Sequence, residues 1–443
     1  MNKNVTIVGS GLAGPLLGIL LAQKYNIRSN MYERNQDFRK TNKYSGRSIN
    51  LALSERGINA LREARIYDSK FKKSLIPMFG RMIHDIDGKQ SFQPYGNKKS
   101  HYINSVSRSE INRLLLDKAE STQKISIKFS SKCSGIDFSN NKIMINETTQ
   151  VYNGPVFGAD GYKSAIAQKI SNHIKLTDIS HSYKELTIQS KNNDFQLDPN
   201  SLHIWPRRNM MLIALPNNDK TFTCTLFMKT KGKNSFESFT DNDKIINFFE
   251  KNFIDIIDLI PNICEYISKN PLGRLITIDV DKWYYKDQAC LIGDSAHAIV
   301  PFYGQGMNAS LEDCVKLCKL IDDADNWESV FYAFNQTRKL DADAISNLAL
   351  KNYVTMRDSV LDKDHILKNE LSLKLMDLYP NYFIPEYTMV SFTNIPYSIV
   401  QKRSKIQEKI LNDIVKKKYS PYELQKEAVE KLIKSNLSRL DYA

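Results

Sequence analysis

The feature that most constrains this chain is a glycine-rich turn near its N-terminus. Gly9, Gly11 and Gly14 follow the apolar stretch Val5–Val8 and precede an apolar segment that reads as a helix to Tyr25. In such a unit the first glycine permits a sharp turn, the second lets the backbone approach a pyrophosphate, and the third lets helix and strand pack closely. The helix N-terminus adds unpaired N–H groups that favour phosphate. The chain is therefore predicted to begin with a dinucleotide-binding βαβ unit.

A carboxylate follows at the position where such a unit recognises a ribose. Glu33 ends a second predicted strand, residues 28–33, and could accept hydrogen bonds from both ribose hydroxyls. NAD and FAD both fit this pattern, so the choice between them depends on motifs further along the chain.

Two later motifs favour a flavin. Asp160 lies in a Gly-Ala-Asp-Gly turn after the apolar pair Val156–Phe157, although this turn alone could join any strand to a helix. The segment Leu291–His297 is more informative, because it places Asp294 at the C-terminal end of a buried strand. Ligands bind at that end of a strand in open α/β sheets, and a carboxylate there can bind the ribityl hydroxyls of a flavin.

The loop after that strand, Pro301–Asn308, fits the ring of a flavin. Gly304 and Gly306 allow the backbone to approach a planar ring closely. The helix predicted to begin near Met307 directs its N–H groups at the negative charge of a reduced flavin. FAD is therefore the predicted bound cofactor.

The rest of the chain reads as a second sheet and a helical end. Residues 202–206, 210–215 and 221–228 form an antiparallel meander, and residues beyond 327 are mainly helical. We predict an α/β protein whose Rossmann-like FAD-binding domain is interrupted by an antiparallel-sheet substrate domain and followed by a helical C-terminal region. The predicted bounds are 1–180 and 275–325 for the first, 181–274 for the second (with residues about 70–100 adding to its sheet), and 326–443 for the third.

Composition restricts the partners. The chain of 443 residues exceeds what one hydrophobic core usually serves, and no apolar run is long enough to span a membrane, so no transmembrane anchor is expected. Its net charge of +13 favours anionic partners, but the basic residues are scattered, which argues against nucleic acid. Six cysteines without a CxxC pair favour a reducing cytoplasm and no metal site.

These motifs together resemble the single-domain FAD monooxygenases of the para-hydroxybenzoate hydroxylase type, over nearly the whole chain. Additional strings are similar to the kynurenine 3-monooxygenase family. They are Gly46–Ser54, Arg81–His84, Ser105–Arg108, Leu202–Arg207, Phe222–Phe227, Phe302–Asn308, and Asn352-Tyr353 with Met356-Arg357. Two positions depart from the family pattern, because Ser295 stands where alanine is common and Tyr303 where phenylalanine is common.

The resemblance implies an NADPH-dependent flavin monooxygenase that hydroxylates L-kynurenine to 3-hydroxy-L-kynurenine through a flavin hydroperoxide, with O2 as co-substrate, in tryptophan degradation. No second glycine-rich dinucleotide motif is visible in the sequence, so NADPH is expected to bind transiently. The flavin supplies the oxygen chemistry, and no side chain is assigned as a certain catalyst. The flavin-loop residues expected nearest to the chemistry are Pro301, Phe302, Gly304 and Gln305.

The resemblance also implies ligand contacts. In addition to Gly9, Gly11, Gly14, Asp160 and Gly306, the implied cofactor contacts are Ala13, Tyr32, Glu33, Arg34, Ala52, Arg108, Asp294, Met307 and Asn308. The implied substrate contacts are Arg81, Tyr95, Asn352 and Tyr397. Arg81 offers a bidentate fork for the substrate carboxylate, the two tyrosines offer phenolic hydrogen bonds, and Asn352 offers a donor and an acceptor. From the residues alone, packing would explain either tyrosine better.

Several residues have a structural interpretation beside the functional one. His297 could act as a base, but the substrate's aniline group already activates the ring, so a structural histidine that bonds a backbone group is favoured. Arg108 could be a surface residue, and Trp205 is favoured as a core residue. An apolar stripe over residues 406–415 with neighbouring lysines could touch an anionic membrane, although packing on the protein itself is favoured.

Other functions remain open at this point. The chain could hydroxylate another aromatic acid, or retain FAD only as a structural group while its tail binds a partner. A flavin halogenase is disfavoured because Trp205, Trp283 and Trp327 are isolated and form no WxWxIP string. Either a monomer or a homodimer is compatible with the sequence.

Overall fold

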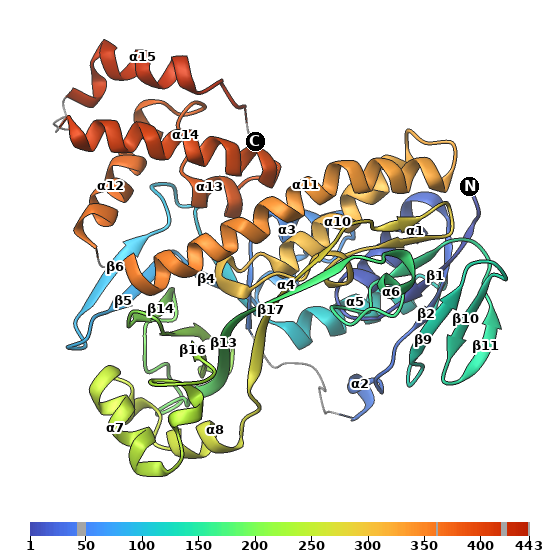
Figure 1. Ribbon diagram of the computed structural model, residues 1–443, viewed down its shortest axis with the longest axis horizontal. Helices are drawn as coiled ribbons and strands as arrows, with labels where there is room; N and C mark the ends of the chain where they lie inside the picture. The colour runs from blue at the N-terminus through green and yellow to red at the C-terminus, as the bar shows by residue number, and fades with distance from the viewer. Residues whose placement is uncertain (42–49, 360–361, 418–422, 442–443) are drawn as a thin grey trace. The chain divides into compact units, whose positions relative to one another are not determined.

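The computed structural model describes residues 1–41, 50–359, 362–417 and 423–441 (Figure 1). The resemblance string that begins at Gly46 therefore lies outside the described residues up to position 49. The chain divides into two compact units, each built from three separate segments. Unit 1 comprises residues 1–75, 106–178 and 276–346, and unit 2 comprises residues 76–105, 179–275 and 347–443.

Unit 1 contains a six-stranded sheet with the order β18-β19-β12-β1-β2-β8. Its strands are β1 (Asn4–Val8), β2 (Arg28–Tyr32), β8 (Ile125–Lys128), β12 (Val156–Gly158), β18 (Tyr284–Tyr285) and β19 (Ala289–Leu291). All neighbours run parallel except β18, which pairs antiparallel with β19. This arrangement confirms the predicted Rossmann-like sheet.

The register of this sheet brings the three predicted motifs to one edge. Val8 lies beside Gly158, and Gly158 lies beside Leu291. Because β1, β12 and β19 are parallel and end together, the turns that follow them leave the sheet at the same edge, where α/β proteins bind ligands.

Helices cover this sheet. The helix α1 (Ala13–Tyr25) is buried over all of its first ten residues, since it packs both on the sheet and on α10 (Gly306–Ile321). This double contact explains why α1 is apolar on every side rather than amphipathic. The other helices of the unit are α2 (Phe38–Thr41), α3 (Glu55–Glu63), α4 (Ser69–Lys72), α5 (Arg108–Ser121), α6 (Ala167–Ile170), α9 (Asp294–His297), the 3-10 turn η3 (Pro301–Tyr303), and the first two thirds of α11 (Trp327–Val354). A strand β3 (Asn50–Leu53) and a small antiparallel sheet of β9 (Cys133–Asp137), β10 (Lys142–Ile145) and β11 (Thr148–Val151) complete it.

Unit 2 contains most of a seven-stranded sheet with the order β17-β13-β16-β15-β14-β5-β6. Its strands are β5 (Gly80–His84), β6 (Gln90–Pro94), β13 (Ile174–Ile188), β14 (Ser201–Pro206), β15 (Met211–Pro216), β16 (Phe222–Lys229) and β17 (Gly273–Val280). The antiparallel meander β14–β15–β16 is confirmed to within one residue at each end. The short strands β4 (Ile76–Met78) and β7 (Ile103–Ser107) pair antiparallel with each other.

One face of this sheet carries its own hydrophobic core. Trp205 is fully buried there, together with Leu226 and Met228, against α7 (Asn242–Asn252) and α8 (Ile263–Lys269). Short 3-10 turns, η1 (Phe236–Ser238) and η2 (Ile257–Leu259), flank these helices. The core position favoured for Trp205 is confirmed.

The C-terminal part of unit 2 is helical, as predicted (Figure 1, orange to red). It consists of the π-helical turn η4 (Thr355–Ser359), α12 (Lys363–Leu378), α13 (Glu386–Ser391), α14 (Tyr397–Lys416), the 3-10 turn η5 (Glu423–Gln425) and α15 (Glu427–Asn436). Ile410 and Ile414 of α14 are buried against apolar residues of α12 and α15. The stripe over residues 406–415 therefore packs on the protein itself, the favoured of the two alternatives.

The two units group the sequence differently from the three predicted segments. Residues 76–105 and 347–443 both belong with the sheet of residues 179–275, and the first two thirds of α11 belong with unit 1. Among the described residues, no helix combines the length and the apolar character needed to cross a membrane.

Candidate cofactor and substrate sites

The first glycine-rich turn is shaped by contacts that leave no space for side chains. Gly9 has a φ of +102°, and a Cβ placed on it would lie 2.3 Å from the carbonyl oxygen of Ala159. A Cβ on Gly14 would lie 2.1 Å from the carbonyl oxygen of Gly9. The first two motifs therefore touch each other, and glycine is required at both positions.

Gly11 differs, because a Cβ there would meet no atom within 4 Å. The open space beside it is what a backbone that approaches a pyrophosphate needs. Asn112 of α5 holds this turn, since its Nδ2 donates to the carbonyl oxygens of Ser10 (2.9 Å) and Gly11 (2.5 Å). Asn112 lies in no local motif, so the sequence alone does not point to it.

Glu33 lies where the ribose-binding carboxylate was expected. Its Oε2 accepts hydrogen bonds from the backbone N–H and the hydroxyl of Ser10, at 2.9 and 3.1 Å. Its Oε1 accepts from the N–H and side-chain amide of Asn35. These four bonds fix the carboxylate against the first turn, half-buried, with lone-pair directions still available for hydroxyl groups.

Asp160 carries an oxygen that the protein leaves without a partner. Its Oδ2 accepts from the N–H of Ala165 at 2.8 Å, whereas its buried Oδ1 has no hydrogen-bond partner among the described residues. Burial raises the pKa of this carboxyl. Buried polar atoms are rarely orphaned in folded proteins, so an oxygen of this kind indicates a place for a donor on a ligand.

The third turn exposes a single carboxylate. Gly293 has a φ of +59°, and a Cβ on it would lie 3.1 Å from the Ser310 hydroxyl. This turn projects Asp294, which is exposed between buried neighbours and makes no hydrogen bond or ion pair within the described part of the chain. An unengaged carboxylate at the C-terminal end of β19 suits the ribityl hydroxyls of FAD.

The side chain of Asn308 holds the flavin loop together, and the loop does not present this side chain to a ligand. Its Nδ2 donates to the carbonyl oxygens of Ala52 and Gly304, both at 2.8 Å, and its Oδ1 accepts from the N–H of Ser54 at 2.9 Å. The carboxamide is thus fully engaged within the protein, and the residue is completely buried. Any contact of Asn308 with a cofactor is left to its backbone.

The same bonds bring β3 and the flavin loop together. Gly304 has a φ of +66°, and a Cβ on it would lie 3.1 Å from that of Ala52. Gly306 opens α10, and Met307 is almost fully buried in its first turn. Phe302 and Gln305 are buried, whereas Pro301 is exposed.

The remaining predicted cofactor residues lie around the first turn. Ala13 begins α1, and Tyr32 ends β2, where its hydroxyl donates to Gln150. Arg34 is exposed just beyond β2. Arg108 begins α5 one helical turn before Asn112, so both side chains lie on the face toward the first turn.

Taken together, unit 1 offers the groups that FAD requires. The open backbone at Gly11 fits a pyrophosphate, Glu33 a ribose, Asp294 a ribityl chain, and the glycines of the loop a flat ring. The orphaned oxygen of Asp160 adds an acceptor next to the first turn.

Unit 2 contains a separate cluster of predicted substrate residues. Arg81 of β5 lies with its Cζ 5.8 Å from the ring centre of Tyr95 and 5.0 Å from that of Tyr387. The two tyrosine rings stack at 4.7 Å with an interplanar angle of 15°. Arg81 and Tyr95 are thus brought together as expected, by a hairpin in which Arg81 pairs with Gln93 two residues before Tyr95.

This cluster has hydrogen-bonding groups in need of a partner. The Nε of Arg81 and the hydroxyl of Tyr95 are buried, and neither meets a partner with hydrogen-bond geometry among the described residues. Burial raises the pKa of Tyr95 well above its usual value, so its hydroxyl stays protonated as a donor. A guanidinium and a phenol with buried, unpaired donors in one cluster suit a carboxylate.

Tyr387 is a residue that the sequence analysis missed. It belongs to α13, and it is Tyr387 rather than Tyr397 that stacks on Tyr95. Tyr397 is fully buried at the start of α14. Asn352 is half-buried near the end of α11, with its Nδ2 3.2 Å from Met356 Sδ. The substrate roles of Asn352 and Tyr397 stay predictions.

One structural expectation needs correction. His297 is buried as expected, but its ring bonds a side chain and, within the part of the chain that the structure describes, no backbone group: Nε2 lies 2.6 Å from the carboxylate of Asp313 on α10. The sequence offered no reason to link residues of two different helices.

Comparisons with known proteins place the chain in a family. A family model described as an FAD binding domain matches residues 2–326. Kynurenine 3-monooxygenase from Myxococcus xanthus is 40% identical over 93% of this chain and 90% of the relative, and that from Cytophaga hutchinsonii is 39% identical over 94% of each.

Solved structures share the fold at low sequence identity. A tetrameric 2-methyl-3-hydroxypyridine-5-carboxylic acid oxygenase covers 83% of this chain and 96% of its own, with a TM-score of 0.66 and 16% identity. Pseudomonas aeruginosa PqsL in complex with 2-aminobenzoylacetate covers 80% of this chain and 97% of its own, with a TM-score of 0.66 and 17% identity.

The fold and the cofactor site define an FAD-dependent aromatic monooxygenase. Identity near 40% over almost the whole length narrows the class further. The chain belongs to the kynurenine 3-monooxygenase family.

Proposed function

We propose that this enzyme hydroxylates L-kynurenine to 3-hydroxy-L-kynurenine, with NADPH as the reductant and O2 as the oxygen donor. The observation that carries the substrate assignment is the cluster of Arg81, Tyr95 and Tyr387, in which the Nε of Arg81 and the hydroxyl of Tyr95 are buried and meet no hydrogen-bond partner among the described residues. The names of the relatives, which align along almost the whole chain, support the same substrate.

The cluster would bind the amino-acid end of kynurenine. The guanidinium of Arg81 and the hydroxyl of Tyr95 would donate to the substrate carboxylate, and the stacked rings of Tyr95 and Tyr387 would keep water away from this ion pair. Binding one end of the substrate tightly orients the aromatic ring at the other end, which is a large part of what a protein contributes to such a reaction.

In unit 1, the backbone at Gly11 would bind the pyrophosphate of FAD, Glu33 its adenosine ribose, and Asp294 its ribityl chain. Bound FAD supplies the redox chemistry that activates dioxygen. In the balanced reaction, one oxygen atom of O2 is inserted into the substrate ring and the other leaves as water. NADPH provides the two electrons as a hydride, and solvent provides one proton. The first turn of α10 directs its N–H groups toward the loop of Gly304 and Gly306, where they would stabilise negative charge.

The test is NADPH consumption by the FAD-loaded enzyme with and without L-kynurenine, with the product identified by mass. We expect kynurenine to stimulate consumption and to yield a product heavier by one oxygen. Consumption that releases only hydrogen peroxide, or stimulation by a different aromatic acid alone, would overturn the substrate assignment. Because the cluster of Arg81 recognises a carboxylate and not the aniline group, anthranilate and benzoate derivatives are the informative competitors.

We also propose that the enzyme acts in the cytoplasm. All six cysteines lie in the described residues as free thiols, and four of them are buried in the cores, which supports a reducing compartment.

Sedimentation of the FAD-loaded enzyme would distinguish the monomer from the homodimer.

A further inference from the structure

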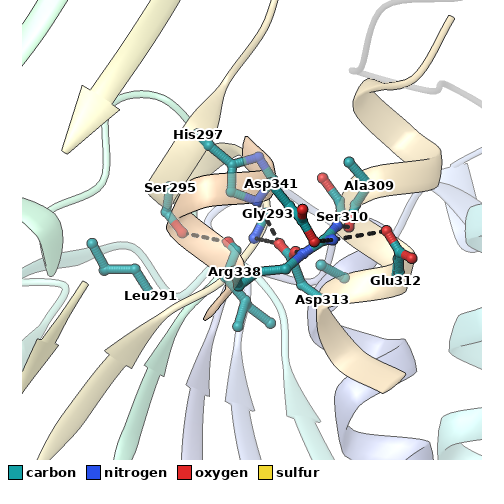
Figure 2. A network of polar contacts seen from close by, with 12 residues as sticks. Leu291, Gly293, Ser295, His297, Ala309, Ser310, Glu312, Asp313, Arg338 and Asp341 are labelled. Atoms are coloured by element: carbon teal, nitrogen blue, oxygen red, sulfur yellow. Dashed lines mark hydrogen bonds and ion pairs between the residues drawn. The ribbon is translucent and has the colours of Figure 1, made fainter. Parts of the chain in front are cut away.

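The polar network behind the third turn centres on one fully buried carboxylate. Asp313 of α10 accepts three hydrogen bonds: from the N–H of Gly293 at 2.9 Å, from His297 Nε2 at 2.6 Å and from Arg338 Nε at 2.6 Å (Figure 2). A carboxylate in this setting can only accept, so Nε2 of His297 is the donor in its bond to Asp313. Figure 2 shows these donors converging on Asp313 from the turn, from α9 and from α11.

Further buried charges extend the network away from the turn. Arg338 Nη1 lies 2.8 Å from Oε2 of Glu312, and Oε1 of Glu312 accepts from Arg56 Nη1 of α3 at 2.9 Å. These three residues are at most 4% exposed. From Arg56 to Asp313 the charges alternate in sign, which offsets the cost of burying each of them.

Asp313 is ionised in spite of its burial. Burial alone would raise its pKa, but the neighbouring His297 and Arg338 hold the pKa below the usual value for an aspartate. The acceptor role toward the Gly293 N–H is therefore kept across the physiological pH range. An isolated charge in such a place would be prohibitive, so the partners are required for it.

The network holds both segments that face the predicted flavin. Through Asp313 it fixes the N–H of Gly293, the residue immediately before Asp294, in a turn that only glycine adopts without strain. Through Arg338 Nη2, which donates to the carbonyl oxygen of Ala309 at 3.1 Å, it fixes the first turn of α10, where Ser310 also donates to Gly306. Neither Asp313 nor Arg338 belongs to either of the two segments.

We propose that Asp313 is a positioning residue for the flavin, with His297 and Arg338 as its partners. It sets the direction of the Asp294 carboxylate and the place of the α10 N-terminus, without being a ligand itself. This inference rests on the proposed contact of Asp294 with the ribityl chain. The proposal also gives His297 a function: its ring donates a second hydrogen bond, which holds the Asp313 carboxylate in the orientation that accepts from the Gly293 N–H.

The test compares Asp313→Asn with Glu312→Gln in the FAD-loaded enzyme. The adjacent Glu312 is equally buried and loses the same charge, but it contacts Arg338 and Arg56 and not the turn. Each holoenzyme is heated while flavin fluorescence reports FAD release and far-UV circular dichroism reports unfolding. In addition, the FAD dissociation constant, the absorption spectrum and the midpoint potential of the bound flavin are measured at 25 °C.

For Asp313→Asn we expect FAD release well below the unfolding temperature, a dissociation constant raised roughly 10- to 100-fold, as for loss of one charged hydrogen bond, and an altered flavin spectrum and potential. For Glu312→Gln we expect release and unfolding to fall together, with an unchanged flavin spectrum. If the two variants behave alike, or if Asp313→Asn lowers only the unfolding temperature, Asp313 is merely structural.

Where Asp313→Asn does not fold, His297→Leu and His297→Gln decide the question. The leucine removes the donor and should release FAD early, whereas the glutamine amide restores a donor and should rescue retention; equal behaviour of the pair overturns the inference. Asp294→Asn separates the two proposals. If Asp294→Asn leaves FAD affinity unchanged, the proposed contact of Asp294 with the ribityl chain is wrong. If Asp294→Asn lowers FAD affinity while Asp313→Asn and His297→Leu do not, only the positioning role of Asp313 is wrong.

Discussion

The two units build their binding sites in opposite ways. In unit 1 the predicted ligand contacts come from backbone turns at Gly9, Ala159 and Gly293, and the side chains behind them are tied to one another. In unit 2 the contacts come from side chains of β5, of α13 and of the residue after β6, and two of their polar atoms have no partner among the described residues. The predicted cofactor site is shaped by rigid turns that present unpaired acceptors, whereas the predicted substrate site presents unpaired donors on side chains.

This difference has a physical reason. A permanently bound group is best served by rigid turns whose cost of ordering is met during folding. A substrate that binds and leaves in every cycle is best recognised by a few charged and phenolic groups whose pairing with it contributes the binding energy. Four changes to the chain would break or sharpen this contrast.

The largest effect is expected for Gly9→Ala. The new Cβ would lie 2.3 Å from the Ala159 carbonyl oxygen in a backbone conformation that alanine disfavours, so the first two turns must separate and FAD retention should be lost. The matched control is Gly232→Ala in unit 2, which has a similar φ of +92° but no atom within 4 Å of the added Cβ. It should retain FAD. Flavin absorbance after gel filtration measures both, and equal retention would contradict the preformed site.

The second expectation concerns acid. Burial lowers the pKa of His203 to about 4, and it also lowers the pKa values of His101 and His365 of the same unit. Below about pH 6.5 these histidines become protonated in the unfolded chain but stay neutral in the folded chain. Their contribution to the free energy of unfolding is therefore fully present above pH 6.5 and is lost as the pH falls toward 4. For His203 alone the loss amounts to about 3 kcal/mol by pH 4.

Asp313 has a lowered pKa and loses its contribution only below about pH 4. Unit 2 should therefore weaken first. Urea unfolding at pH 7 and pH 5, compared between the unmodified enzyme and His203→Gln, measures this effect. The variant should show a shallower pH dependence, and an unchanged slope would assign the acid sensitivity elsewhere.

A smaller effect is expected for Arg81→Ala. Loss of one charge-assisted bond to a carboxylate should weaken kynurenine binding by about 1.5–3 kcal/mol, while FAD affinity stays unchanged. Equilibrium binding of kynurenine, followed by the flavin spectrum, measures it. If Arg81→Ala lowers the affinity for FAD instead, the cofactor and substrate sites are not independent.

The smallest effect distinguishes two tyrosines. Tyr95→Phe keeps the stack on Tyr387 but removes the hydroxyl that would donate to the substrate carboxylate, and it should weaken kynurenine binding by about 0.5–1.5 kcal/mol. Tyr397→Phe is the matched change at the other tyrosine that the family resemblance indicates. If only Tyr397→Phe weakens binding, Tyr95 has merely a packing role.

The contrast also explains what the sequence could predict. The three turns are local patterns of strand, glycine and helix, so the sheet, its ligand edge and Glu33 were predictable, as was the meander β14–β16. Asn112, Asp313 and Tyr387 were not, because each acts on residues far away in the chain and lies in no motif. Asn308 was selected by a motif, yet its carboxamide bonds Ala52, Ser54 and Gly304 instead of facing outward. The family resemblance identifies the residue, but only the three-dimensional contacts show which of its atoms are already hydrogen-bonded within the protein.

The interleaving of the two units governs how this protein can be made. β12 gains its neighbour β19 only after more than a hundred further residues, most of which belong to unit 2. During synthesis the apolar β12 therefore presents an open edge while the ribosome is still producing the other unit, a situation that invites aggregation. Neither unit can be cut out as a continuous fragment, so expression yield at low temperature or with chaperones should depend on how quickly the residues up to Leu291 emerge.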